Sequence, residues 1–137
     1  MLLLMPLWSK TIRCCWLKGA LLGGFLNRDE TVEQALRREV KEESGWEVGD
    51  LKLLHIKDNP DRPAERERQN IEFVFIAEAK SKVGESDEEV KELEWFDLEN
   101  LPDFDQIAFD HADDLELYIK YLKENFPVPF IGKYSDR

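Results

Sequence analysis

The hydrophobic pattern along the chain predicts both strands and helices. Residues 70–79, NIEFVFIAEA, are rich in aromatic and β-branched residues, which favours a β-strand. Residues 31–44 and 109–126 are predicted to be helices, because residues that commonly begin or end a helix bound each of them. Further strands are predicted within residues 11–22, at 51–57 and at 92–98. Strands and helices that mix without strict alternation favour an α+β fold, layered around a mixed sheet.

Specific residues mark the ends of the two helices. Asp29 or Thr31 is expected to cap the first helix, because each offers a side-chain oxygen to the free backbone N–H groups there. Gly45 is expected to end that helix, since glycine adopts a left-handed backbone at little cost. Asp110 is expected to cap the second helix, which Pro127 prevents from continuing. The segment after Pro127 is predicted to be an irregular tail.

Composition narrows the class of protein. A chain of 137 residues fits one domain with one core. Its net charge of −11 disfavours binding to nucleic acid, and a phosphorylated substrate would need a cation as mediator. Cys14 and Cys15 are adjacent and poorly placed for a mutual disulfide, which favours reduced thiols in a cytoplasmic protein and no metal role. The apolar opening MLLLMPLW is too short to cross a bilayer and reads poorly as a signal peptide, so no membrane partner is predicted.

Three glutamates lie close together on the first predicted helix. With Glu39 at zero, Glu43 lies at about +40°, Glu42 at about −60° and the apolar Leu36 at about +60°. The opposite side is predicted to face solvent and to hold Glu33, Gln34, Arg37, Lys41 and Ser44. A solvated face, with ion pairs such as Arg38 beside Glu42, is the ordinary interpretation of such a charge run. Glu39 and Glu43 instead continue the apolar stripe, which favours a site for a hard divalent cation such as Mg²⁺.

Glycine, arginine and a further acid extend this cluster into a longer motif. Between residues 24 and 46 the chain has Gly, five residues, Glu, seven residues, Arg-Glu-Val, one residue, Glu-Glu, one residue and Gly-Trp. This pattern resembles the Nudix box, and eight of its nine specified positions match. The ninth is Trp46, where the box has an aliphatic residue. Nine positions with fixed gaps are a far more specific signal than a single glycine motif.

The resemblance implies a fold and an activity. The fold would be a Nudix-type α/β/α sandwich with a mixed β-sheet, one domain over residues 1–137, whose box at 24–46 forms a loop and a helix. Members of the family hydrolyse a nucleoside diphosphate linked to a further group, using Mg²⁺ or Mn²⁺. Metal-binding positions of the family fall on Glu39, Glu42 and Glu43. Catalytic roles are assigned to Glu42, Glu43 and Arg38, and structural roles in the box to Gly24, Glu30 and Gly45. Stabilisation of the helix N-terminus is an alternative role for Glu30.

A general base completes the implied mechanism. Bound divalent ions would neutralise the phosphates and lower the pKa of a coordinated water, whose proton a carboxylate would accept. In this family the base varies in identity and sometimes lies on a later loop. The candidates here are Glu85, Glu88 and Glu89, and we prefer Glu89 because it stands just before the strand predicted at 92–98. A solvated acidic turn is the alternative for each of them.

Segments beside the box indicate the substrate. Family members that act on ADP-ribose tend to have a proline fifteen to seventeen residues beyond the box, and Pro60 lies fifteen residues after the last box glycine. Arg62 would meet phosphate, and Trp16 and Phe25 would stack on a base, with solvation of the arginine and core packing of the aromatics as alternatives. His111 belongs to a segment similar to one in ADP-ribose-type members. ADP-ribose or a related sugar nucleotide is the expected substrate, and a nucleoside triphosphate is the alternative.

The N-terminus departs from the usual layout of the family. Leu22 stands where a proline is usual, and residues 1–16 do not read like the usual first strand. A partner subunit would cover a sheet edge left exposed in this way, which makes a homodimer an expectation. Two other functions compete with hydrolysis: a Nudix-like module that binds or senses a nucleotide, and an acidic interaction domain with a chance motif.

Overall fold

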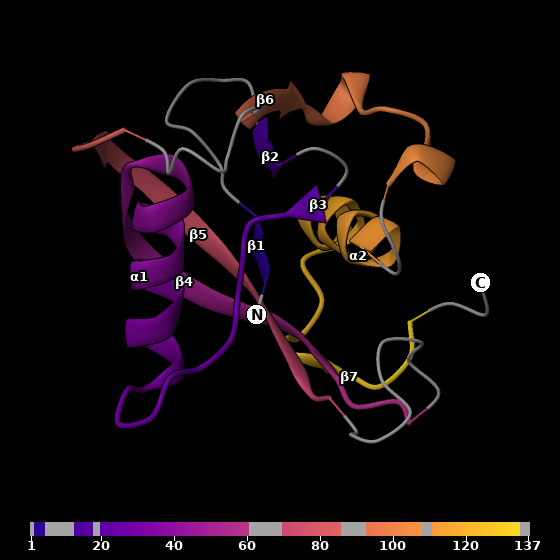
Figure 1. Ribbon diagram of the computed structural model, residues 1–137. Helices are drawn as coiled ribbons and strands as arrows, with labels where there is room; N and C mark the ends of the chain where they lie inside the picture. The colour runs from indigo at the N-terminus through magenta and orange to yellow at the C-terminus, as the bar shows by residue number, and fades with distance from the viewer. Residues whose placement is uncertain are drawn as a thin grey trace.

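Two sheets and two long helices make up the computed structural model (Figure 1). It describes residues 2–4, 13–17, 20–60, 70–85, 93–107 and 111–134, with side chains from Leu22 onward except at 93, 94 and 104. The strands are β1 (Leu2–Leu4), β2 (Arg13–Leu17), β3 (Ala20–Leu21), β4 (Trp46–Lys57), β5 (Glu72–Lys82), β6 (Leu93–Asp97) and β7 (Phe130–Ile131). The helices are α1 (Val32–Ser44) and α2 (His111–Glu124), with 3₁₀ turns η1 (Leu98–Asn100) and η2 (Phe104–Gln106).

The larger sheet is mixed, with strand order β1-β5-β4-β7. Its centre is the antiparallel pair of β4 and β5, in which Trp46 lies opposite Lys82 and Lys57 lies opposite Glu72. The edge strands β1 and β7 run parallel to β5 and β4, respectively. A second, antiparallel sheet has the order β3-β2-β6. The α+β fold with a mixed sheet, predicted from the sequence, is confirmed.

The two long helices cover opposite faces of the larger sheet (Figure 1). Leu36 of α1 packs in one core cluster with Ala77 of β5, whereas Leu115 of α2 packs in the other with Val74. Residues 74 and 77 point to opposite faces, because side chains alternate along a strand. The layers therefore form the expected α/β/α sandwich. In the part of the chain that the structure describes, neither helix is long and apolar enough to cross a membrane.

The residues predicted to bound α1 do so. Thr31 is the cap, and its hydroxyl accepts a hydrogen bond from the Gln34 N–H at 3.1 Å while the Gln34 side chain accepts one from the Thr31 N–H at 2.8 Å. Gly45 ends the helix with φ of 73°, in the left-handed region. The prediction that Ser44 faces solvent is wrong, since this side chain is buried and donates to the Val40 carbonyl. The chain turns back at Gly45 directly into β4, which covers the last turn of the helix.

Short strands form near both ends of the chain, and the prediction of an irregular tail is wrong. Residues Leu2–Leu4 form the strand β1, which pairs with residues 74–76 of β5. In the segment expected to be an irregular tail, Phe130–Ile131 forms β7, with Phe130 opposite His55 of β4. Each strand is very short and lies at a sheet edge, so its partner rather than its own sequence determines its conformation.

Candidate active site

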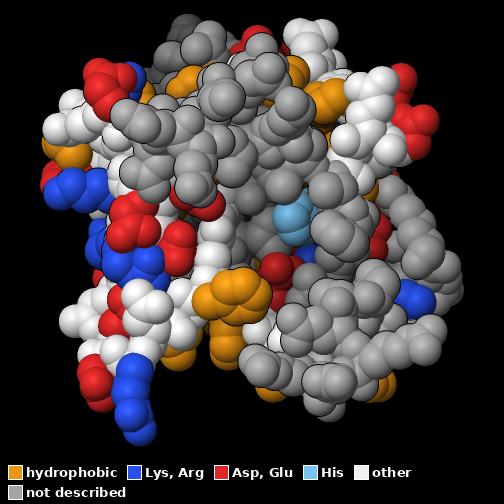
Figure 2. All heavy atoms as spheres, viewed as in Figure 1, with side chains coloured by type: hydrophobic (Ala, Val, Ile, Leu, Met, Phe, Trp, Pro, Cys, Tyr) orange, Lys and Arg blue, Asp and Glu red, His pale blue; other side chains and the backbone are white. Residues whose placement is uncertain are grey.

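The three box glutamates differ in how far they are buried. The Glu39 side chain is 17% exposed and Glu43 is half-buried, whereas Glu42 is 50% exposed. Glu39 and Glu43 therefore point toward the interior, as their angular position beside Leu36 predicts, and Glu42 lies at the rim. Figure 2 shows acidic and basic side chains interleaved along α1.

Arg38 connects three of the four acidic residues that the box pattern specifies. Its guanidinium donates two hydrogen bonds to Glu30, at 2.7 and 3.1 Å, and one to Glu39 at 2.8 Å. It also donates to Glu42 at 3.2 Å and to the Phe25 carbonyl at 3.1 Å. The bonds to Glu30 and then to Glu39 raise the pKa of Arg38 above its ordinary value. The guanidinium therefore stays charged and fixes the helix and the preceding loop to each other.

Glu30 belongs to this network. Its Oε1 accepts from the Asn27 N–H at 2.6 Å as well as from Arg38. The bond from Arg38, followed by the bond from Asn27, holds the pKa of Glu30 below its ordinary value. Thr31 and Gln34 already satisfy N–H groups of the first helical turn. These hydrogen bonds of Glu30 go to Arg38 and to the loop, and stabilisation of the helix N-terminus stays an alternative role.

The loop before α1 passes close to the box carboxylates. A Cβ on Gly24 would overlap the Glu39 carboxylate, so a larger residue here would push this carboxylate out of its observed position. The Gly23 N–H donates to Glu43 Oε2 at 3.1 Å. Leu22, which takes the place of the family's usual proline, is fully buried in the core cluster beneath α1. The Gly23 N–H and the buried Leu22 side chain together hold the loop against the carboxylates of Glu39 and Glu43.

The donor set of this cluster suits a hard divalent cation. Mg²⁺ and Mn²⁺ take oxygen ligands, and Glu39, Glu42 and Glu43 present carboxylates from neighbouring turns of one helix. Arg38 carries one positive charge, whereas Glu30, Glu39 and Glu42, which it contacts, each carry a negative charge. The cluster as a whole is therefore negative. Among the residues that the structure describes, no three acidic, cysteine or histidine side chains converge on one ion position. A bound ion would have to compete with Arg38 for Glu39 and Glu42.

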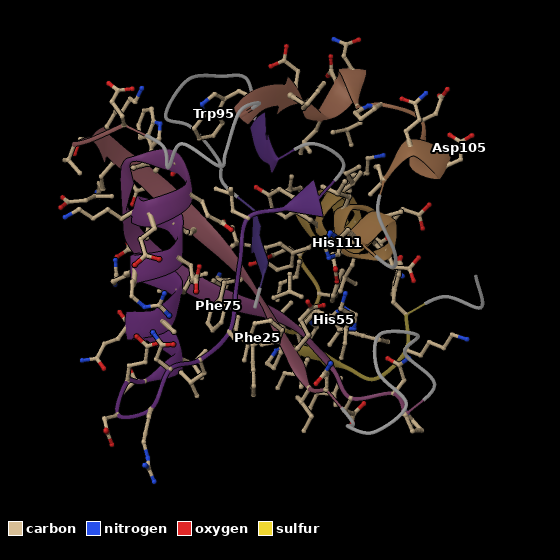
Figure 3. All side chains as sticks on the ribbon, in the orientation of Figure 1. Phe25, His55, Phe75, Trp95, Asp105 and His111 are labelled. Carbon is tan, nitrogen blue, oxygen red and sulfur yellow. The ribbon has the colours of Figure 1, made fainter. Side chains whose placement is uncertain are left out.

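Other candidate residues are more widely spread. Phe25 is 81% exposed, so core packing is not its role, and Pro60 is also exposed. His111 is half-buried at the first turn of α2, across the sheet from α1, as Figure 3 shows with Phe25 in the loop before α1. Glu85 is exposed and pairs with Lys82 at 3.4 Å. The side chain of Trp16 and the residues Arg62, Glu88 and Glu89 lie outside the described residues.

Sequence analysis missed a buried charge cluster, which consists of His55, Lys57, Glu72 and Asp114 on the α2 side of the sheet. Asp114 Oδ1 lies 2.9 Å from His55 Nδ1, and the Lys57 ammonium donates to Asp114 Oδ2 at 2.6 Å. Lys57 also pairs with Glu72 at 2.6 Å. Burial alone would lower the pKa of Lys57, but Asp114 and Glu72 outweigh this effect and raise it. The sequence did contain an indication of this cluster. His55 and Lys57 lie two residues apart and so share one face of a strand, and Asp114 stands one helical turn before the buried Tyr118.

Comparison with known protein families gives a match that extends well beyond the box. The family model described as NUDIX domain matches residues 3–118. An ADP-ribose pyrophosphatase of Methanocaldococcus jannaschii is 38% identical over 102 residues, which cover 74% of this chain and 57% of that protein. The chain therefore spans little more than half the length of this curated relative.

Solved structures with low sequence identity share the fold. The NUDIX domain of Shewanella oneidensis NrtR, complexed with ADP ribose, superposes with a TM-score of 0.70 at 18% identity, covering 88% of this chain and 85% of that chain. An ADP-ribose pyrophosphatase from Streptococcus suis 89-1591 gives a TM-score of 0.67 at 17% identity, covering 96% of both chains. At these identities the likeness concerns the fold alone.

Proposed function

Since the chain belongs to the NUDIX domain family, we propose that it hydrolyses the pyrophosphate linkage of a nucleoside diphosphate derivative. The proposed substrate is ADP-ribose or a related sugar nucleotide, and one product is a nucleoside monophosphate. The observation that carries this proposal is the box itself, in which Arg38 gathers Glu30, Glu39 and Glu42 beside a loop that passes close to Glu39 at Gly24. The name of the curated relative and the ADP ribose in one structural neighbour support this choice of substrate.

The box residues would divide the chemistry as follows. Glu39, Glu42 and Glu43 would hold Mg²⁺ or Mn²⁺, which when bound neutralises phosphate charge and lowers the pKa of a coordinated water. One guanidinium nitrogen of Arg38 donates to both Glu39 and Glu42, and the Gly23 N–H donates to Glu43. Glu89 is proposed as the general base that accepts the proton of the attacking water, ahead of Glu85 and Glu88.

Substrate contacts would come from segments around the box. The exposed ring of Phe25 is available to stack on a base. Arg38 donates a hydrogen bond to the Phe25 backbone carbonyl at 3.1 Å, which fixes the position of the Phe25 backbone. Trp16 is proposed as a second stacking residue, Arg62 as a phosphate contact and Pro60 as a residue that shapes the pocket. The acidic character of the chain explains why a cation would have to accompany a doubly anionic substrate.

A substrate panel tests this proposal. The purified chain is incubated with ADP-ribose, a UDP-sugar, a dinucleotide and a nucleoside triphosphate, each with Mg²⁺ or Mn²⁺, and products are separated by chromatography. We expect ADP-ribose to yield AMP and ribose 5-phosphate, with kcat/KM at least about tenfold above the triphosphate, a difference of about 1.4 kcal/mol in transition-state binding. Preference for the triphosphate would instead favour a pyrophosphohydrolase. Tight binding of ADP-ribose without products would favour a non-catalytic module.

A further inference from the structure

Arg37 joins the box helix to the strand that follows it. Its guanidinium donates from Nη1 to the Val48 carbonyl and from Nη2 to the Gly49 carbonyl, the latter at 3.0 Å. Its Nε and Nη2 also donate to Glu33, at 3.2 and 2.9 Å, but Glu33 belongs to the same helix. In Figure 1, β4 passes behind α1. Of the contacts of Arg37, the two to the strand carbonyls therefore fix the helix to the sheet.

The carbonyls of Val48 and Gly49 lie in an irregular part of β4. Val48 is opposite Ala79 and Leu51 is opposite Ala77, so three steps along β4 match two steps along β5. Val48 and Leu51 both pack in the core cluster beneath α1, whereas residues three apart in a regular strand point to opposite faces. Consecutive carbonyls of a regular strand also point in opposite directions. One guanidinium reaches both of these carbonyls because the strand is bulged here.

Arg37 lies on the far side of α1 from the box carboxylates. With Glu39 at zero on the helical projection, Arg37 lies at about 160° and Glu43 at about +40°. The apolar side of α1 packs into the core cluster through Leu36 and Val40, and the bonds of Arg37 add a directional restraint on another side of the helix. A helix rotation of about 10° would move a carboxylate that lies about 6 Å from the axis by about 1 Å. The rotation of α1 therefore has a large effect on the proposed chemistry, because misplacing a reacting group by about 1 Å can slow catalysis by about 10²-fold.

We propose that Arg37 is a positioning residue, which fixes the rotation of α1 about its own axis and with it the places of Glu39 and Glu43. The inference rests on the proposed function, because that function has these two glutamates hold the cation. Arginine suits the task, because its planar fork of N–H donors reaches two carbonyls at once, whereas a lysine ammonium is a single compact charge. The Gly23 N–H donates to Glu43 at 3.1 Å, so its environment reports whether Glu43 stays in place.

The variant Arg37→Met tests this role, since it keeps an apolar stem and removes every donor. We expect kcat for ADP-ribose to fall and the Kd for Mn²⁺ to rise, each by about tenfold, while KM at saturating metal stays within about twofold. The matched control is Lys41→Met, which removes the same charge from the same helix and breaks an exposed pair with Glu47 of β4 at 3.8 Å. This control should keep kcat and the Kd for Mn²⁺ within about twofold of wild type, because exposed ion pairs contribute little.

The Gly23 amide, followed by nuclear magnetic resonance, provides a readout that does not depend on turnover. In Arg37→Met its chemical shift should change and its hydrogen exchange should accelerate, whereas in Lys41→Met both should match wild type. Arg37→Lys keeps the charge but cannot bridge both carbonyls, so it should change in the same direction, and it serves as the test if Arg37→Met does not fold.

A Gly23 amide that is unchanged in a folded Arg37 variant would overturn the inference. Equal losses of kcat and of Mn²⁺ affinity in Arg37→Met and Lys41→Met would also overturn it, because they would reflect charge alone. If wild type hydrolyses nothing in the panel, the proposed function fails, and the Gly23 amide then decides this inference by itself.

Discussion

Glu43→Gln is expected to lower kcat for ADP-ribose hydrolysis by roughly 10²–10³-fold, the scale of losing one preorganised electrostatic group. The amide keeps an oxygen that accepts the Gly23 N–H, now at 3.1 Å from the carboxylate, and it has nearly the same shape. The variant should therefore fold as wild type does. What it removes is the negative charge that would hold the cation under the pyrophosphate. Steady-state kinetics at saturating Mg²⁺, together with Mn²⁺ binding followed by electron paramagnetic resonance, measure both effects.

Glu33→Gln is the matched control on the same helix. Glu33 is 62% exposed and pairs with Arg37 at 2.9 Å on the side of α1 away from Glu43. This variant removes the same charge and should keep the kcat and the Mn²⁺ affinity of wild type. If Glu43→Gln also kept the kcat and the Mn²⁺ affinity of wild type, the box carboxylates would not form the metal site. That result would favour the alternative of an acidic interaction domain with a chance motif.

Asp114→Asn is expected to lower the free energy of unfolding by about 3–5 kcal/mol, as found when one partner of a buried ion pair is removed. Asp114 is fully buried and bonds both His55 and Lys57, so the variant leaves Lys57 with Glu72 as the remaining carboxylate of the cluster. Urea unfolding at pH 7 measures the loss. Glu124→Gln, at the exposed end of the same helix, should stay within about 0.5 kcal/mol of wild type. A loss in Asp114→Asn no larger than in this control would contradict the account.

The difference in the free energy of unfolding between wild type and Asp114→Asn should depend on pH. The pKa of Lys57 is raised in the folded state, so the stabilisation it provides is fully present below its ordinary value of 10.5. It is lost as pH rises through the raised folded-state value. Unfolding curves at rising alkaline pH should therefore bring wild type and variant closer together. A difference that grows with pH would show that the sign is wrong.

Local periodicity predicted the parts of the site that lie within one helix. A repeat of 3.6 residues is enough to place Glu39 and Glu43 beside Leu36, and the structure shows both partly buried there. Thr31 and Gly45 bound the helix as predicted, because capping depends on the residues at the cap itself. Gly24, to which the resemblance gives a structural role, lies close to the Glu39 carboxylate.

Features that depend on distant residues were not predicted. His55 meets Asp114 across 59 positions of sequence, and no local pattern says that a strand histidine and a helix aspartate will pair. The bonds from Val83 and Gly84 to Gly45 arise from the return of β5 beside β4, which strand propensity does not specify. A single domain over residues 1–137, a homodimer and a cytoplasmic location stay predictions.

Release of AMP from ADP-ribose, followed with and without a chelator, tests the central claim most directly. The account predicts AMP and ribose 5-phosphate in the presence of Mg²⁺ or Mn²⁺, no product after EDTA, and full recovery when the metal is restored, because the box carboxylates act through a bound cation. Product formation that EDTA leaves unchanged would contradict this account.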